Sequence, residues 1–167
     1  MGSLYWQVND SNPVISWSSI DYYHRWTALH YAAKKFYAPV LISADGEDKD
    51  NIRLNISSER REEFSAVIRW RSRMNTGEVI MQGMEDVTVK PLSAEDFITL
   101  TPENTGISHD MRDKAYIEFT VIEKGIRLSS GTFMFVRPKS FRFADPELKI
   151  AAVDMGRKFK IVVSAKA

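Results

Sequence analysis

The 167-residue chain contains no cysteine, which excludes disulfide bonds, thiolate metal sites and a cysteine nucleophile. It also has no excess of one charge, because 23 Lys and Arg residues face 22 Asp and Glu residues. No apolar run approaches the roughly 20 residues of a membrane-spanning helix. The start, MGSLYWQVND, lacks the basic and apolar regions of a signal peptide. We therefore expect no membrane partner, and no nucleic acid bound through a broad basic face.

The composition that is present is typical of a globular protein. Hydrophobic residues make up 44% of the chain and charged residues 27%, a balance that argues against a disordered chain. The length corresponds to one domain, or to one domain and a piece of another.

Aromatic residues gather at the start of the chain. Three of the four tryptophans lie within the first 26 residues, and five of the six tyrosines within the first 37. From Pro39 onward, charged residues alternate with Val, Ile and Phe. Because proline disfavours the helical conformation in the residue before it, a helix should end near Ala38. The sequence therefore predicts a boundary between residues 38 and 39.

The first segment, residues 1–38, is predicted to contain a strand, a loop and a helix. Leu4–Val8 is short, aromatic and prone to β structure. Apolar residues recur at helical spacing between Tyr22 and Tyr37. Three polar residues before this helix are candidates for its N-cap, namely Ser18, Ser19 and Asp21.

Residues 39–141 are predicted to form an antiparallel immunoglobulin-like β-sandwich. Short segments of alternating polarity recur between turn signals, and they are 40–44, 52–56, 64–73, 79–82, 87–91, 116–121 and 131–136. On the third segment, Trp70 falls on the apolar face and is assigned to the core. Arg69, Arg71 and Arg73 form a basic stripe on the opposite face, which is either solvated or paired with carboxylates across an interface.

Residues 142–167 contain two further candidate strands, Leu148–Val153 and Phe159–Val163. Two strands alone are marginally stable in water. They are therefore expected either to join the preceding sandwich or to begin another sandwich domain.

Two runs in the first segment resemble the β-mannosidases of glycoside hydrolase family 2. These runs are LYWQVND at residues 4–10 and SWSSIDYYHRWTALHYAAKKFYAPV at residues 16–40. In that family a (β/α)8 barrel is followed by immunoglobulin-like sandwiches, and the runs resemble the last barrel strand, its loop and its final helix. Two residues depart from the family pattern: Asn12 stands where relatives often carry Trp, and His24 stands where they usually carry Gly.

The resemblance implies that the chain is a C-terminal fragment of a retaining β-mannosidase, an enzyme that hydrolyses terminal non-reducing β-D-mannosyl residues. The fold it implies is mainly β, with the remnant of a barrel before an immunoglobulin-like sandwich that supports the barrel. Retaining glycosidases need two carboxylates about 5 Å apart. In this family both are glutamates on earlier barrel strands, so the chain alone is expected to lack catalytic residues and activity. Its expected partners are the missing barrel and N-terminal domains and, in the parent enzyme, a β-mannoside.

The resemblance also implies three substrate-binding candidates. Trp6 would form part of the platform under the sugar, because an aromatic face suits the apolar surface of a pyranose. Asn9 and Asp10 would either bond a sugar hydroxyl or stabilise their own loop. Trp17 and Trp26 are assigned to packing. No cofactor or metal site is expected, because the three histidines do not show the spacing of metal ligands.

Two alternatives stay open. The sandwich could be an independent carbohydrate-binding or protein-interaction module, although Trp70 and Tyr116 both fall at apolar-face positions in the alternation. The chain could also be the same portion of a β-galactosidase or β-glucuronidase relative. In any of these cases the aromatic first segment is expected to pack on the sandwich, to be disordered or to mediate self-association.

Overall fold

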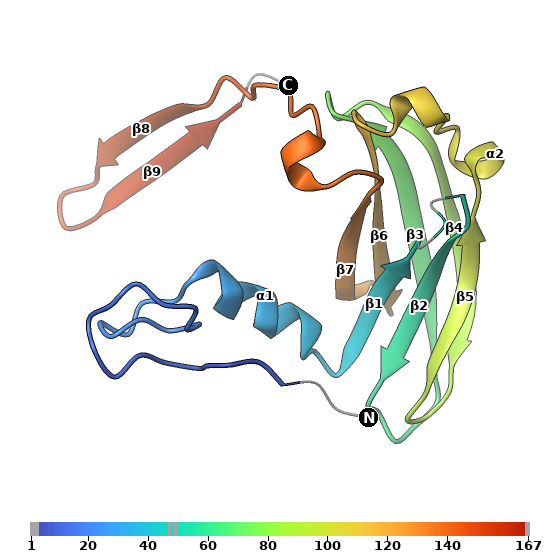
Figure 1. Cartoon of the computed structure of the whole chain (residues 1–167), viewed down its shortest axis with the longest axis horizontal. Coiled ribbons are helices and arrows are strands. Elements are labelled where there is room, and N and C mark those ends of the chain that lie inside the picture. The colour runs from blue at the N-terminus through green and yellow to red at the C-terminus, as the bar shows by residue number, and fades with distance from the viewer. Residues whose placement is uncertain (1–3, 47, 49, 166–167) are drawn as a thin grey trace.

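The computed structural model describes residues 4–46, 48 and 50–165, and two antiparallel sheets dominate it (Figure 1). One sheet contains, in spatial order, β1 (Val40–Asp45), β2 (Ile52–Ser58) and β5 (Ala94–Leu100). The other contains, in spatial order, β4 (Val79–Val89), β3 (Phe64–Met74), β6 (Ala115–Glu123) and β7 (Ile126–Met134). The two sheets pack face to face and form the predicted sandwich.

Alternating side chains along the strands build the core between the sheets. On β2, Ile52, Leu54 and Ile56 are buried, whereas Arg53 between them is exposed. The same period of two on β3 and β6 directs one face of each strand into the core. Trp70 packs against this core from β3, as predicted. The apolar-face position predicted for Tyr116 is wrong. This residue alternates with the buried Ala115 and Ile117 and so lies on the outer face.

The prediction of the other strands was partly wrong. Val79–Gln82 and 87–91 were predicted as two strands, but β4 runs continuously because it pairs with β3 along its whole length. β5 was missed, and it completes the first sheet by pairing with β2. The strand predicted at residues 131–136 begins earlier, at Ile126. A two-residue turn at Lys124 and Gly125, both with positive φ, fixes this register.

The first segment is less regular than predicted. Leu4–Val8 does not form a strand, and the pairing there is limited to isolated bridges from Ile20 to Asn9 and to Trp26. The helix α1 (Ala28–Phe36) begins six residues later than Tyr22, because a tight turn precedes it. Its end agrees with the prediction, and Lys34 and Lys35 lie in its last turn, where cations suit the helix dipole.

Three short helical elements complete the sandwich. They are α2 (Pro102–Thr105) and the 3-10 turns His109–Met111 and Pro138–Ser140. In the part of the chain that the structure describes, no helix is long and apolar enough to cross a membrane.

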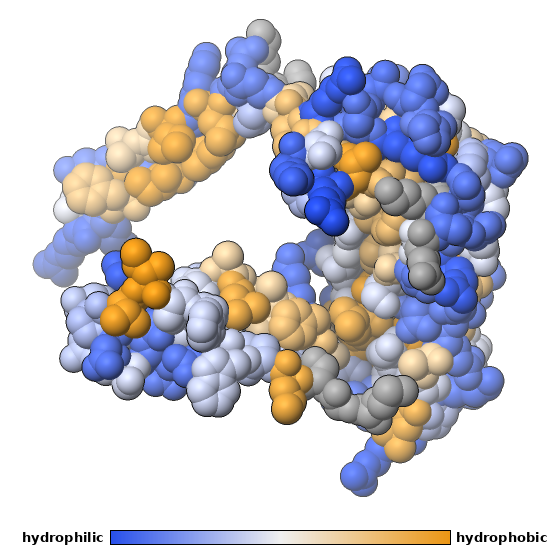
Figure 2. Space-filling view, in the orientation of Figure 1, coloured by the Kyte–Doolittle hydropathy of each residue, from blue (hydrophilic) through white to orange (hydrophobic). Residues whose placement is uncertain are grey.

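The last two strands form a separate hairpin. β8 (Lys149–Asp154) pairs with β9 (Phe159–Ser164) and with neither sheet of the sandwich. Every residue of both strands is exposed, and apolar side chains cover much of the hairpin (Figure 2). Of the two outcomes predicted for residues 142–167, joining the sandwich is therefore wrong. That they begin another domain stays a prediction.

Candidate functional site

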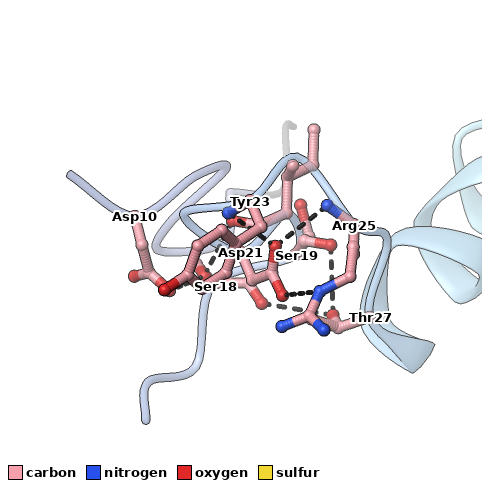
Figure 3. A network of polar contacts seen from close by, with 8 residues as sticks. Asp10, Ser18, Ser19, Asp21, Tyr23, Arg25 and Thr27 are labelled. Atoms are coloured by element: carbon pink, nitrogen blue, oxygen red, sulfur yellow. Dashed lines mark hydrogen bonds and ion pairs between the residues drawn. The ribbon is translucent and has the colours of Figure 1, made fainter. Parts of the chain in front are cut away.

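Asp10 accepts hydrogen bonds from three side chains of the first segment, and Figure 3 shows it beside one of them, Ser18. The Ser16 hydroxyl donates to Asp10 Oδ1 at 2.5 Å, and the Ser18 hydroxyl donates to Oδ2 at 2.7 Å. The Gln7 amide adds a longer bond to Oδ1 at 3.4 Å. These hydrogen bonds, that of Ser16 first, hold the pKa of the buried Asp10 carboxyl below its usual value. Asp10 is therefore an ionised acceptor that ties its loop together.

Ser19 forms a second set of contacts behind this loop. Its hydroxyl donates to the carbonyl of Val8 at 2.9 Å and lies 3.0 Å from both Tyr5 Oη and His30 Nδ1. A serine beside a histidine resembles the pairing of a nucleophile with a base. Ser19 is fully buried, however, so its role is structural. Neither Ser18 nor Ser19 caps α1, and the N-cap residue is Thr27.

Asp21 organises the turn that delays the start of α1. Its Oδ1 accepts from the backbone N–H groups of Tyr23 and Arg25, both at 2.9 Å. Its Oδ2 accepts from Arg25 Nε at 2.6 Å (Figure 3). The bond from the Arg25 backbone is the main reason that the pKa of Asp21 is lowered. Asp21 is thus engaged in its own turn.

The aromatic candidates are more exposed than the polar ones. Trp6 is 75% exposed, and the peptide bond that follows it is cis. Asn9 is also exposed, and its side-chain amide donates one long hydrogen bond, of 3.4 Å, to the backbone carbonyl of Asp10. The packing role predicted for Trp17 is wrong within this chain, because the residue is 70% exposed. Trp26 is half exposed and contacts His30 on α1, with ring centroids 4.4 Å apart.

The three predicted site residues therefore divide into two kinds. Trp6 and Asn9 present a ring and an amide to solvent, whereas both oxygens of Asp10 accept from neighbouring side chains. The structure thus favours the loop-stabilising role for Asp10. Sequence reasoning missed the partners of Asp10, although Ser16 and Ser18 follow it at a spacing that a short loop can close.

The Asp10→Asn variant should loosen this loop. An asparagine has one acceptor oxygen in place of two and no charge, so one serine hydroxyl loses its acceptor. We expect faster amide hydrogen exchange at residues 16–20 near neutral pH. In the unchanged chain, the lowered pKa means that the stabilisation is present above the usual carboxyl value of 3.8. It is lost as the pH falls through the folded-state pKa.

The control for this variant is Asp86→Asn, the same substitution at an exposed residue on β4. It should leave exchange at residues 16–20 unchanged. If Asp10→Asn also left it unchanged at neutral pH, the hydrogen bonds of Asp10 would not be holding the loop.

His24→Gly should stabilise the turn before α1. His24 has φ 62°, in the left-handed region, which costs a residue with a side chain about 1–2 kcal/mol. The greater freedom of glycine in the unfolded chain offsets about 0.4–1 kcal/mol of this gain. We expect a net gain of about 0.5–1 kcal/mol, seen as slower exchange of the Arg25 amide. His109→Gly, at an exposed residue without positive φ, should give no such gain.

No metal site accompanies these residues. Among residues 4–46, 48 and 50–165, no three His, Asp or Glu side chains are grouped so that they could hold a metal ion. A depression of about 670 Å³ lies elsewhere, on the sandwich between β3, β4 and the end of β6. There Arg60 is paired with Glu123 at 2.8 Å and stacks on Phe64.

The curated proteins similar to this chain include β-mannosidases from animals and fungi. The chain is 52% identical over 50 residues to β-mannosidase from Capra hircus, a match that covers 30% of this chain and 6% of that protein. It is 49% identical over 43 residues to β-mannosidase A from Aspergillus terreus, covering 26% of this chain and 5% of that protein. The matches thus span a small part of these relatives.

A solved structure supports the fold over nearly the whole chain. The β-D-mannosidase from Dictyoglomus thermophilum superposes with a TM-score of 0.74 and 15% identity, covering 96% of this chain and 20% of that one. The model of the mannosidase Ig/CBM-like domain family matches residues 50–140. Because this match takes in more than half of the chain and includes β2 to β7, the chain belongs to the mannosidase Ig/CBM-like domain family.

Proposed function

We propose that this chain is the non-catalytic C-terminal portion of a retaining β-mannosidase, which hydrolyses terminal non-reducing β-D-mannosyl residues. The observation that carries the proposal is the 52% identity over 50 residues to a β-mannosidase. Within the chain we propose three parts: the end of the barrel at residues 1–38, the sandwich at residues 39–141, and the start of a further domain at residues 142–167.

The carboxylates of the first segment support a non-catalytic role. A retaining glycosidase places a nucleophile and an acid/base about 5 Å apart on either side of the glycosidic bond. Residues 1–38 contain two carboxylates, Asp10 and Asp21. Asp10 accepts from two serines, and Asp21 accepts from Arg25 and from the backbone of its own turn. Neither is free to attack a sugar or to protonate a leaving group.

Trp6 and Asn9 are the residues that we propose to meet the substrate. The exposed ring of Trp6 could stack under the apolar face of a mannosyl unit, and the Asn9 amide could bond one of its hydroxyls. Asp10 would act as a positioning residue, because its bonds to Ser16 and Ser18 hold the loop that carries both.

The connection between α1 and β1 supports a buttressing role for the sandwich. Three residues separate the end of the helix at Phe36 from the first strand at Val40. Tyr37 contacts Phe36 and Tyr5, with ring centroids 4.7 and 6.3 Å apart. So short a link leaves the sandwich little freedom to move relative to the helix.

The first segment is nevertheless not packed on the sandwich. In the described part of the chain, α1 has no extensive contact with either sheet, and Figure 1 shows it projecting away from them. Leu4 and Ile15 are almost fully exposed. We propose that the missing barrel covers these side chains in the longer enzyme. The predicted packing on the sandwich is wrong, and self-association stays a prediction.

The test compares this chain with the longer enzyme on chromogenic β-mannoside, β-galactoside and β-glucuronide. We expect an active longer enzyme that prefers the β-mannoside and an inert chain. Turnover by the chain alone would contradict the non-catalytic role. Preference for another glycoside would leave the fold unchanged but remove mannose as the substrate.

A variant of the longer enzyme tests Trp6 directly. Removing an aromatic side chain that contacts a ligand at the centre of a site commonly costs about 2 kcal/mol or more. Trp6→Ala should therefore lower kcat/KM for the β-mannoside about thirtyfold or more. Trp17→Ala removes a similarly exposed tryptophan from the same segment and serves as the matched control. Equal losses in both variants would assign them to folding of the segment rather than to the substrate.

A further inference from the structure

The arginine stripe on β3 is only partly neutralised within the sheet. Glu118 on β6 pairs with Arg73 at 2.9 Å and with Arg71 at 3.6 Å. Arg71 Nε also donates to Gln82 on β4 at 3.1 Å. Arg69 is exposed and has no ion-pair partner among the described residues. One cation of the stripe is therefore available for an external anion.

A second unpaired arginine reaches the same face through a β-bulge. Val121 pairs with Ser129, but the next residue, Ile122, pairs with Arg127, so Leu128 is an extra residue on β7. Leu128 packs on the core, and the Ser129 hydroxyl accepts from a backbone N–H of β1. Two inward residues in a row place Arg127 on the outer face, as bulges commonly do where they redirect a side chain.

Arg127, like Arg69, is exposed and lacks an ion-pair partner within residues 4–46, 48 and 50–165. The two arginines line one depression of about 370 Å³ on the outer face of the four-stranded sheet. Hydroxyl groups lie beside them: Thr120, on the strand between β3 and β7, pairs with Arg69 and with Ser130, whereas Arg127 pairs with Ile122, two residues further along β6. Thr132 extends the hydroxyl row along β7.

The chemistry of this depression is specific. A guanidinium group presents a planar fork of donors that matches a carboxylate. Threonine and serine hydroxyls both donate and accept, and so match the hydroxyls of a sugar. Glu118, a carboxylate that lines the depression, is already paired with Arg73 and with Arg71. A ligand that carries both a carboxylate and hydroxyls would satisfy the two free cations and the hydroxyl row together.

We propose that this face binds a uronic acid residue of an acidic oligosaccharide. Arg69 and Arg127 bind its carboxylate, and Thr120 and Ser130 bond its ring hydroxyls. The site lies on the sandwich, and it does not depend on the function proposed for the first segment.

The experiment titrates the isotope-labelled chain with tetragalacturonate, and mannotetraose serves as the neutral probe. Amide shifts should appear on β3, β6 and β7 with the acidic probe and not with the neutral one. Arg69→Gln and Arg127→Gln should each weaken binding about tenfold, because each removes a charge-assisted hydrogen bond. The double variant should abolish binding. Both side chains are exposed and unpaired, so the variants should stay folded.

Two controls make the proposal falsifiable. Lys149→Gln removes one cation from the exposed β8 and should leave binding unchanged. Equal weakening by this variant would show a general charge effect and overturn the site. A tetraglutamate peptide tests the other source of carboxylates, and equal or tighter binding of this peptide would overturn the assignment to carbohydrate. Equal binding of mannotetraose would overturn the role of the arginines.

Discussion

Replacing Leu54 with alanine is expected to lower the free energy of unfolding of the sandwich by about 2–5 kcal/mol. Leu54 is fully buried on β2, the central strand of the three-stranded sheet. It lies opposite Ala44 on β1 and Ile98 on β5, and it faces the core that both sheets share. The truncation removes apolar contacts and leaves a cavity that a close-packed core fills only in part. Urea unfolding followed by far-ultraviolet circular dichroism measures the loss.

The control for this prediction lies one strand away. Thr99 on β5 is exposed and pairs with Arg53, so Thr99→Ala should change the free energy of unfolding by no more than about 0.5 kcal/mol. The dependence on urea should keep the same slope in both variants if the native surface is unchanged. A loss at Leu54 no larger than that at Thr99 would contradict a single core shared by the two sheets.

Gly131→Ala is expected to lower the free energy of unfolding by about 1–3 kcal/mol, because it overpacks a row of residues that crosses the four-stranded sheet. The row runs from Gly83 through Trp70 and Phe119 to Gly131. A Cβ atom on Gly131 would lie 2.4 Å from the Phe119 ring, and one on Gly83 would lie 2.7 Å from the Trp70 ring. Each aromatic ring therefore covers a glycine on the neighbouring strand. Phe119 is 3% exposed and has little room to move.

Two further variants isolate the cause of this loss. Ser130→Ala changes the neighbouring residue on the outer face and should be neutral to within about 0.5 kcal/mol. Phe119→Leu combined with Gly131→Ala should cost less than the sum of the two single variants, because the smaller side chain leaves space for the new methyl group. Strict additivity would show that the ring does not oppose the methyl group.

Strands with one clear apolar face were predictable from local sequence. Residues 52–56 alternate strictly and residues 64–73 alternate with few exceptions, a pattern that a sheet with one buried face favours. β4 and β5 were harder to predict. β4 contains a run of mainly polar residues from Gln82 to Asp86, and only its pairing with β3 keeps this run extended. Cross-strand hydrogen bonds determine the conformation of such a segment, and these bonds cannot be predicted from the segment's own sequence.

The candidate site shows the same division. Trp6, Asn9 and Asp10 were identified through a resemblance over the first 40 residues, before any geometry. The loop-stabilising role of Asp10 could be assigned only once the positions of Ser16 and Ser18 were known, because their hydroxyls donate to its carboxylate. The outward position of Arg127 required the bulge at Leu128, because a strict alternation along β7 cannot place two consecutive residues on one face.

The sequence by itself determined the class of this protein, the approximate extent of its sandwich and its family resemblance. These follow from periodicity, turn residues and an unusually aromatic run, all of which are local properties of the chain. The tertiary structure alone decided which strands are neighbours, which carboxylates are engaged and which arginines are free. Those outcomes depend on hydrogen bonds and packing between residues far apart in the chain, such as Arg71 with Glu118 and Phe119 with Gly131.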